Sequence, residues 1–339
     1  MANCDSFFQD LHEKIKLDPV RTGQIQKAHI KMRDYLAQVK ELKEIFKDTF
    51  LQGSYATHTG VKPPPDSDFD VDIVLLLDLS TKEGGLLAPN DVLDLLLAIL
   101  VRNPEYADKA EKHPKGKCIR IQFTEKFHVD LLPAHCAKGL DDPILVPKHG
   151  DWVSSHPKGF IKWCETQSIR SDGKFTRITK YLKWWRNNNF ASEASPKSIT
   201  LTTLVGQIVP KASSDAEALV RTMEGILKFL LANLAKPVIS NPSLPSEDLA
   251  KDWKSEHYDL FKRAFQIATV KARKAYDEPD EQKSAKLWNE LFQGDPEIRL
   301  LEEALKKGDV YSKGPSVIIG KPDRETQHAH VVRSKSYRP

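Results

Sequence analysis

From Asp70 onward polar and apolar side chains alternate, with Asp70, Asp72 and Val74 on one side, which is the repeat of a β-strand with two different faces. Asp70 and Asp72 lie on one face, and residues two apart on a strand are separated by roughly 6–7 Å, so both carboxylates can turn toward one point. Two carboxylates placed in this way can coordinate a hard cation through their oxygen atoms. The opposite face is predicted to be apolar and comprises Val71, Ile73, Leu75 and Leu77.

A second stretch with the same alternation covers residues 127–134, and residues 118–123 have the pattern of its hairpin partner. Asp130 lies inside this strand, where a carboxylate is costly unless it is paired or binds a cation. Two interpretations follow. Asp130 is either a third acid converging with Asp70 and Asp72, which would repel one another without cations, or a residue held by a salt bridge or a helix cap.

Most of the remaining chain has the three- and four-residue repeat of amphipathic helices. Residues 5–50 are predicted to be helical, with one long helix whose apolar stripe runs from Ile25 to Phe46. Residues 134–158 contain three prolines and are predicted to be irregular. From residue 160 onward the pattern indicates helices alone. Helices are expected at 89–102, at 174–188, from 196, at 215–235, from 246 to about 276, and at roughly 279–292 and 295–307.

The change of pattern near residue 159 predicts two lobes, and a chain of 339 residues is long enough to form two cores. We expect an α+β lobe with a mixed, twisted sheet over residues 1–158 and an all-helical lobe over residues 159–307. The basic end, residues 308–339, has the composition of a tail without fixed structure.

Composition narrows the class of protein without fixing its partners. A net charge of +4 permits a nucleotide or nucleic-acid partner but does not demand one. The longest apolar run, residues 92–101, is too short to cross a bilayer, and the N-terminus lacks the pattern of a secretory signal. We therefore expect a cytoplasmic protein with no membrane partner. The four cysteines are scattered, which indicates neither a disulfide framework nor a zinc site.

A short turn precedes the paired-carboxylate strand by about fifteen residues. Gln52, Gly53 and Ser54 provide a residue without a side chain and a small hydroxyl, the composition of a turn whose backbone N–H groups can surround phosphate. Such turns are common, and so is an isolated Asp-x-Asp. Together they supply one group for the anion and one for its metal, as a Mg²⁺-bound nucleoside triphosphate requires.

Two weaker candidates lie in the predicted helices. Lys180 and Lys183 are one turn apart on the helix at 174–188, where a lysine pair is usually just solvated. Ser198 follows Pro196 at the predicted start of the next helix, where the free backbone N–H groups and the helix dipole favour binding of an anion.

The order of these features resembles the CD-NTases of bacterial antiphage CBASS operons, which are relatives of cyclic GMP-AMP synthase and oligoadenylate synthases. The features are Gly53-Ser54, Asp70-Val71-Asp72, Asp130, Lys183-Trp184-Trp185, Pro196-Lys197-Ser198 and the proline-rich segment 237–253, and the resemblance covers about residues 20–305. It implies a polymerase-β-like nucleotidyltransferase core with a long N-terminal spine helix.

The resemblance also implies roles. Asp70, Asp72 and Asp130 would hold two Mg²⁺ ions, with Mn²⁺ as a substitute, and Ser54, Lys183 and Ser198 would contact the triphosphate. Asp68 is an alternative ligand, but the apolar run that anchors the strand begins directly after Asp70 and Asp72. The zinc insertion of the animal sensors has no counterpart, so direct activation by nucleic acid is in doubt. Operon-encoded proteins are the regulators that the resemblance suggests.

Three functions remain open at this point. The first is a template-independent synthase that joins nucleoside triphosphates, ATP among them, into a cyclic di- or trinucleotide second messenger and releases pyrophosphate. The second is a transferase that makes linear oligonucleotides or attaches nucleotides to RNA, an antibiotic or a protein. The third is a pseudoenzyme that binds nucleotide as an interaction module, which the intact carboxylates oppose.

Overall fold

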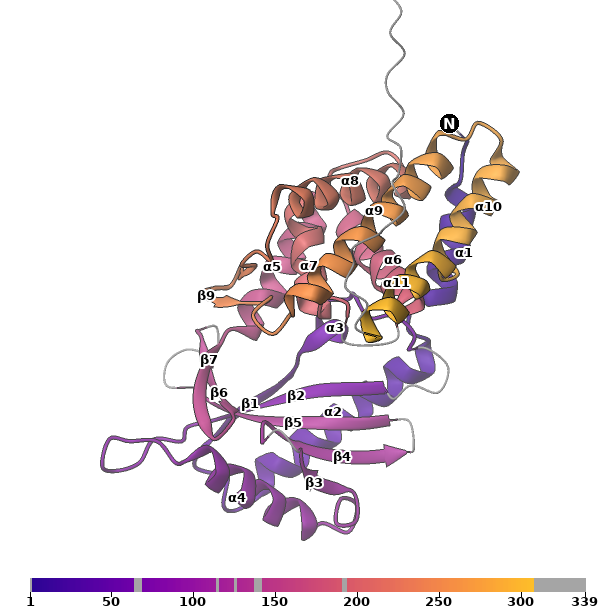
Figure 1. Cartoon of the computed structure of the whole chain (residues 1–339). Helices are drawn as coiled ribbons and strands as arrows, with labels where there is room; N and C mark the ends of the chain where they lie inside the picture. The colour runs from indigo at the N-terminus through magenta and orange to yellow at the C-terminus, as the bar shows by residue number, and fades with distance from the viewer. Residues whose placement is uncertain are drawn as a thin grey trace, which may run out of the picture.

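Two lobes lie one above the other, a sheet lobe and a helical lobe (Figure 1). The computed structural model describes residues 2–63, 69–113, 116–124, 127–136, 142–190 and 194–307. The predicted C-terminal tail and Asp68 lie outside these ranges. Within them, no helix has both the length and the apolar character needed to cross a membrane.

The sheet lobe is built on a mixed sheet in which the two acid-bearing strands are neighbours. Strand β2 (Phe69–Leu77) runs parallel to β5 (Phe127–His135), and its other neighbour is the antiparallel β1 (Phe46–Leu51). Next to β5 come β4 (Ile119–Thr124) and β3 (Ala110–Lys112), and β6 (Ile144–Lys148) also pairs with β5 before turning into β7 (Asp151–Ser155). The hairpin predicted between residues 118 and 134 is confirmed.

The apolar face of β2 is covered by α2 (Pro19–Gln38) and α4 (Pro89–Val101), which supply the other side of a shared core. Val71 and Ile73 from β2 are buried there with Met32 from α2 and Leu96 from α4. Val74 and Leu76 face the other way into a separate small cluster. The alternation read from the sequence therefore corresponds to two distinct surfaces of the strand.

The short helix α3 (Gly53–Ala56), which lies between β1 and β2 in the chain, is placed where the two lobes meet, and the chain enters the helical lobe at α5 (Figure 1). The core of the helical lobe is formed mainly by α6, α8 and α9, and α1 (Asp5–Ile15) packs into it although it precedes the sheet in the chain. The helices are α5 (Pro157–Arg170), α6 (Lys174–Asn189), α7 (Ser198–Ile208), α8 (Asp215–Ala232), α9 (Ser255–Asp277), α10 (Glu281–Phe292) and α11 (Pro296–Lys306).

One predicted helix is too long. The helix that begins at Pro19 ends at Gln38, and residues 46–51 form strand β1 instead. Thr49 of β1 is buried against α2, where its hydroxyl lies 3.0 Å from Nε2 of His29. Pairing with the free edge of β2 satisfies the backbone of β1, and this tertiary gain outweighs the helical spacing of its apolar residues.

Two other predictions were wrong because strands were missed. The segment predicted to be irregular contains the β6–β7 hairpin, whose two-residue turn, His149-Gly150, has φ of 54° and 87° as such turns require. The helix predicted from Ser246 begins at Ser255 instead, and Ser246 lies in a second hairpin. That hairpin pairs β8 (Ser240–Asn241) with β9 (Leu244–Asp248).

Candidate active site

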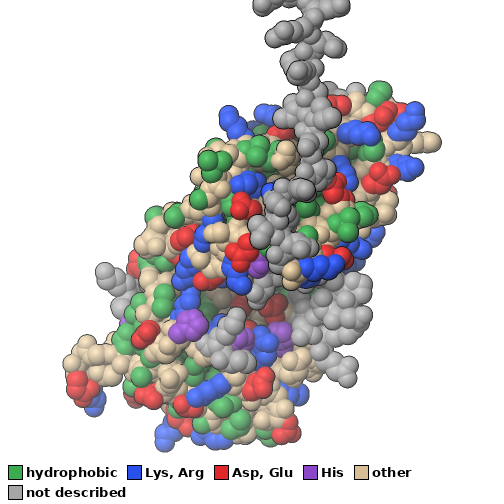
Figure 2. Space-filling model, viewed as in Figure 1, with side chains coloured by type: hydrophobic (Ala, Val, Ile, Leu, Met, Phe, Trp, Pro, Cys, Tyr) green, Lys and Arg blue, Asp and Glu red, His purple; other side chains and the backbone are tan. Residues whose placement is uncertain are grey.

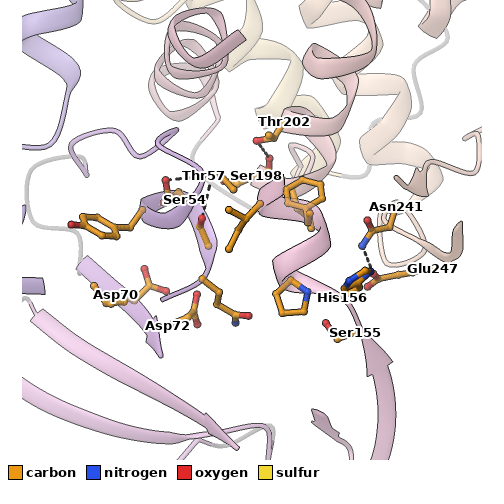
Figure 3. Close-up of a pocket in the computed structure, with 18 of the residues that line it drawn as sticks. Ser54, Thr57, Asp70, Asp72, Ser155, His156, Ser198, Thr202, Asn241 and Glu247 are labelled. Atoms are coloured by element: carbon orange, nitrogen blue, oxygen red, sulfur yellow. Dashed lines mark hydrogen bonds between the residues drawn. The ribbon is translucent and has the colours of Figure 1, made fainter. Parts of the chain in front are cut away.

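A cleft of about 440 Å³ opens between the two lobes and contains most of the predicted site (Figure 3). Its floor is the start of β2 and its roof is formed by α5, α6 and α7. The predicted site residues that line it are Gln52, Gly53, Ser54, Asp70, Asp72, Lys183 and Ser198. Residues separated by more than a hundred positions in the chain therefore surround one space.

The turn at Gly53 lies directly against a carboxylate of β2. The backbone N–H of Gln52 donates to the carbonyl oxygen of Asp72 at 3.0 Å, which continues the strand pairing into the turn. Gly53 has a φ of 74°, and a Cβ at this residue would lie 3.1 Å from Oδ2 of Asp72. Two features therefore favour glycine at this residue: the positive φ and the close approach of the Asp72 carboxylate.

Asp70 and Asp72 point into the cleft below Ser54 (Figure 3). Asp70 is exposed, whereas Asp72 is half-buried. Burial and the neighbouring charge of Asp70 raise the pKa of Asp72 to about 6, because both disfavour a second negative charge. A cation between the carboxylates would relieve this repulsion, so the pair is suited to a divalent ion.

Asp130 lies beside Asp72 in the parallel register of β2 and β5, so the predicted proximity of the two strands is correct. Its side chain, however, is only 1% exposed and is bound by Arg120, whose Nε and Nη2 donate at 2.9 and 3.1 Å. Burial alone would raise the pKa of Asp130, but the Arg120 guanidinium and Lys117 hold it below its usual value. The salt bridge left open by the sequence is thus present, and a metal-binding role for Asp130 stays a prediction.

Lys183 lines the cleft and is 3% exposed, whereas the ammonium group of most lysines on a helix is solvated. Its ammonium donates to the hydroxyl of Thr59 at 2.8 Å and to its carbonyl oxygen at 3.3 Å. Burial and the charge of Arg186 lower the pKa of Lys183 to about 7. An anion in the cleft would restore the favourable environment that this ammonium lacks.

Ser198 starts α7 at the rim of the cleft, as predicted, and its hydroxyl oxygen accepts from Nη2 of Arg186 at 3.1 Å. Burial lowers the pKa of Arg186 to about 10, yet the group stays protonated at neutral pH. Arg186 therefore places a positive charge next to the hydroxyl of Ser198.

The residues present suit Mg²⁺, although they do not enclose an ion on their own. Among the described residues, no three His, Cys, Asp or Glu side chains gather to hold a metal. Mg²⁺ is commonly held by one or two carboxylates together with substrate phosphates. Asp70 and Asp72 lie beside the turn at Gly53, whose backbone N–H groups could bind phosphate, and so match that arrangement.

Comparison with known proteins assigns a family to this chain. Residues 1–168 match the Second Messenger Oligonucleotide or Dinucleotide Synthetase domain. A cyclic AMP-AMP-GMP synthase from Enterobacter hormaechei is 24% identical over 322 residues, covering 77% of this chain and 83% of the relative. A cyclic AMP-AMP-AMP synthase from Acinetobacter is 25% identical over 299 residues, covering 84% and 83%. The chain belongs to the CD-NTase family.

Solved structures of other CD-NTases have the same fold. CdnG of Bradyrhizobium diazoefficiens, solved in complex with GTP, superposes with a TM-score of 0.69 at 18% identity and covers 89% of this chain and 98% of its own. Vibrio cholerae DncV in its apo form gives 0.66 at 17% identity and covers 86% and 95%. The polymerase-β-like core expected from the sequence is thereby confirmed.

This CD-NTase also has cleft residues that the sequence did not single out. His156 points into the cleft from the start of α5, and the β8–β9 hairpin contributes Asn241 and Glu247 (Figure 3). Asn241 donates to Glu247 at 2.7 Å, and Ser243 holds the backbone of His156 through its hydroxyl at 3.1 Å. None of these residues forms a motif, and only the folded hairpin brings them to the cleft.

Proposed function

We propose that this CD-NTase joins nucleoside triphosphates into a cyclic oligonucleotide second messenger in the cleft between its lobes. The observation that supports this most is the placement of Asp70 and Asp72 against the turn at Gly53, opposite Lys183 and Ser198. Carboxylates on one wall and cationic or hydroxyl groups on the other fit a metal-bound triphosphate. The relatives that share the fold include synthases of cyclic di- and trinucleotides.

Different cleft residues would bind the phosphates and the metal ion of the substrate. The backbone of Gln52 and Gly53 and the hydroxyl of Ser54 would bind the phosphates, and Lys183 and Ser198 would hold them from the helical lobe. Asp70 and Asp72 would bind Mg²⁺, with Asp130 joining them only if Arg120 released it. Mg²⁺ supplies charge neutralisation at the phosphates and lowers the pKa of the attacking hydroxyl.

The reaction itself is an in-line displacement at phosphorus. A ribose hydroxyl of one nucleotide loses its proton and forms a bond to the α-phosphate of the other, and the bond from that phosphate to pyrophosphate breaks. A second displacement within the linear product would close the ring. Fixed charges around the phosphates stabilise this transition state, because the negative charge spreads over their oxygens.

The resemblance to CD-NTases of antiphage operons suggests a cellular role. We place the protein in cytoplasmic antiphage signalling, with nucleoside triphosphates as its small-molecule partners and operon-encoded proteins as its regulators. A related CD-NTase, CdnC of Escherichia coli, has been solved in a complex with a HORMA protein. Activation by a protein partner is therefore the form of control that we propose to test first.

The test is to identify the product. The purified protein is incubated with labelled ATP, GTP, CTP and UTP and Mg²⁺, with and without its operon-encoded partners, and the products are treated with phosphatase before mass analysis. A cyclic product has no terminal phosphate, so we expect a phosphatase-resistant di- or trinucleotide. Products that lose their phosphates would instead indicate a linear transferase, and unchanged nucleotides in every mixture would support the binding-module alternative.

A further inference from the structure

A second hollow, of about 650 Å³, lies between the tip of the β6–β7 hairpin and the beginnings of α7 and α9. Among the residues that the structure describes, none lines both this hollow and the catalytic cleft. The sheet lobe contributes Lys117, Lys148 and His149, whereas the helical lobe contributes Lys197 and Lys254 among others. On the face drawn in Figure 2, basic and histidine side chains gather along the hollow between the lobes.

The charge of this hollow is opposite to that of the catalytic cleft. Among the described residues, four lysines and three histidines line it and Asp252 is the one acid, which already accepts from Lys197 at 2.7 Å. Of the residues that the structure describes, the catalytic cleft has three acids, Asp70, Asp72 and Glu247, against one lysine. A polyanion therefore needs metal ions to enter the catalytic cleft but meets a net positive charge in the second hollow.

One lysine of the hollow lies among like charges. The neighbouring Lys251, burial and the charge of Lys197 lower the pKa of Lys148, although the charge of Asp252 opposes them. Like charges held together in this way are stabilised when an anion sits between them. The arrangement suits a ligand that carries more than one negative group.

The groups that present these lysines are fixed by the fold. The turn at His149 is held in a positive-φ conformation at the end of the paired strands β6 and β7. On the other side, the hydroxyl of Thr200 in α7 donates to the carbonyl oxygen of Leu249 at 2.9 Å, and the buried Trp253 precedes α9. The hollow is thus built from ordered elements of both lobes.

We propose that this second hollow is a binding site for a small molecule bearing several phosphate groups, which it holds without a divalent metal and by contacts from both lobes. The site is linked to the catalytic cleft at two points. Lys117 lies 3.6 Å from Asp130, and Lys197 directly precedes Ser198. A ligand bound here fixes the lobes relative to one another, so it regulates the cleft or positions a substrate beside it.

The experiment measures binding of inorganic triphosphate by isothermal titration in EDTA, where the catalytic carboxylates cannot recruit a metal. The wild-type protein is expected to bind, and more weakly as salt is raised. Lys197→Ala combined with Lys254→Ala removes two exposed lysines of the hollow and is expected to weaken binding by about tenfold or more. Lys228→Ala combined with Lys286→Ala, two exposed lysines on α8 and α10, is the matched control and should bind as the wild type does.

A further variant separates the two sites. Asp70→Asn combined with Asp72→Asn is expected to keep the metal-free binding, whether or not the protein proves to be a cyclic nucleotide synthase. Absence of binding in EDTA at millimolar triphosphate, or equal losses in the hollow and control variants, would overturn the proposal. Competition then identifies the source: displacement by ATP or GTP points to a nucleotide, and its absence points to another cellular polyphosphate.

Discussion

Asp72 shows how a single residue can be costly to the fold and useful to the site. It lies half-buried on β2 between Asp70 and the Arg120-bound Asp130, with the turn at Gly53 against its carboxylate. A group in this position prefers to be protonated in the metal-free protein, as its raised pKa indicates. Such a residue is expected where a metal ion is part of the working state.

The pH dependence of stability tests this interpretation of Asp72. Because its pKa is raised to about 6 in the folded protein, the folded state binds the proton more tightly than the unfolded state does. The wild-type protein should therefore lose stability as the pH rises from about 4 through 6, by at most about 3 kcal/mol. Asp72→Asn, which cannot ionise, should melt at a higher temperature than the wild type at pH 8 without metal.

The comparison is made by thermal melts in EDTA between pH 4 and pH 8, with Asp78→Asn as the control. Asp78 follows the same strand at its far end and is paired with Lys47 in solvent. The difference between Asp72→Asn and the wild type should shrink toward pH 4. If the difference in melting temperature between Asp72→Asn and the wild type were the same at every pH, Asp72 would not be under electrostatic strain.

At the scale of elements, alternation predicted the strands that carry acids but not the strands that lack a clear repeat. The β2 and β5 segments were identified because one face of each is apolar, and α6 was identified from the stripe that includes Phe175 and Trp185. Strand β1 was not predicted because the spacing of its apolar residues also fits a helix. The β6–β7 and β8–β9 hairpins were not predicted because prolines interrupt their sequences. Pairing with distant strands decides these cases, and a local repeat does not contain that information.

The short element α3 yields a prediction of its own. Gly53→Ala adds a Cβ 3.1 Å from Oδ2 of Asp72 and forces alanine to adopt a φ of 74°. We expect a loss of about 1 kcal/mol in stability from the backbone strain, together with a fall in nucleotide turnover of about tenfold or more because the carboxylate is displaced. Turnover and urea denaturation are measured on the same preparation.

Gly84→Ala is the matched control, since Gly84 has a φ of 80° but no heavy atom within 4 Å of the added Cβ. It should lose similar stability while keeping its turnover. If both variants lost the same activity, the contact between the turn and Asp72 would have no particular role.

At the scale of the whole molecule, the site exists only because two lobes meet. The sequence identified Asp70, Asp72, the turn and Ser198 from local signals, and the structure places these around one cleft, whereas Asp130 is not among the described residues that line it. It did not reveal that Lys183 is buried against Thr59 or that Arg120 binds Asp130, since those contacts join segments far apart in the chain. Nor did it reveal the β8–β9 hairpin, which lines one side of the cleft and whose Ser243 donates to the carbonyl oxygen of His156, directly before α5.

The central claim is that Asp70 and Asp72 support nucleotide joining in this cleft, and its most direct measurement is pyrophosphate release from nucleoside triphosphates in Mg²⁺. Asp70→Asn and Asp72→Asn keep the shape of each side chain but remove the charge that holds the metal. We expect each to lower the rate by about a thousandfold or more relative to the wild type, while Asp78→Asn releases pyrophosphate at the wild-type rate. Wild-type turnover in both cleft variants, with folded structure retained, would contradict the account.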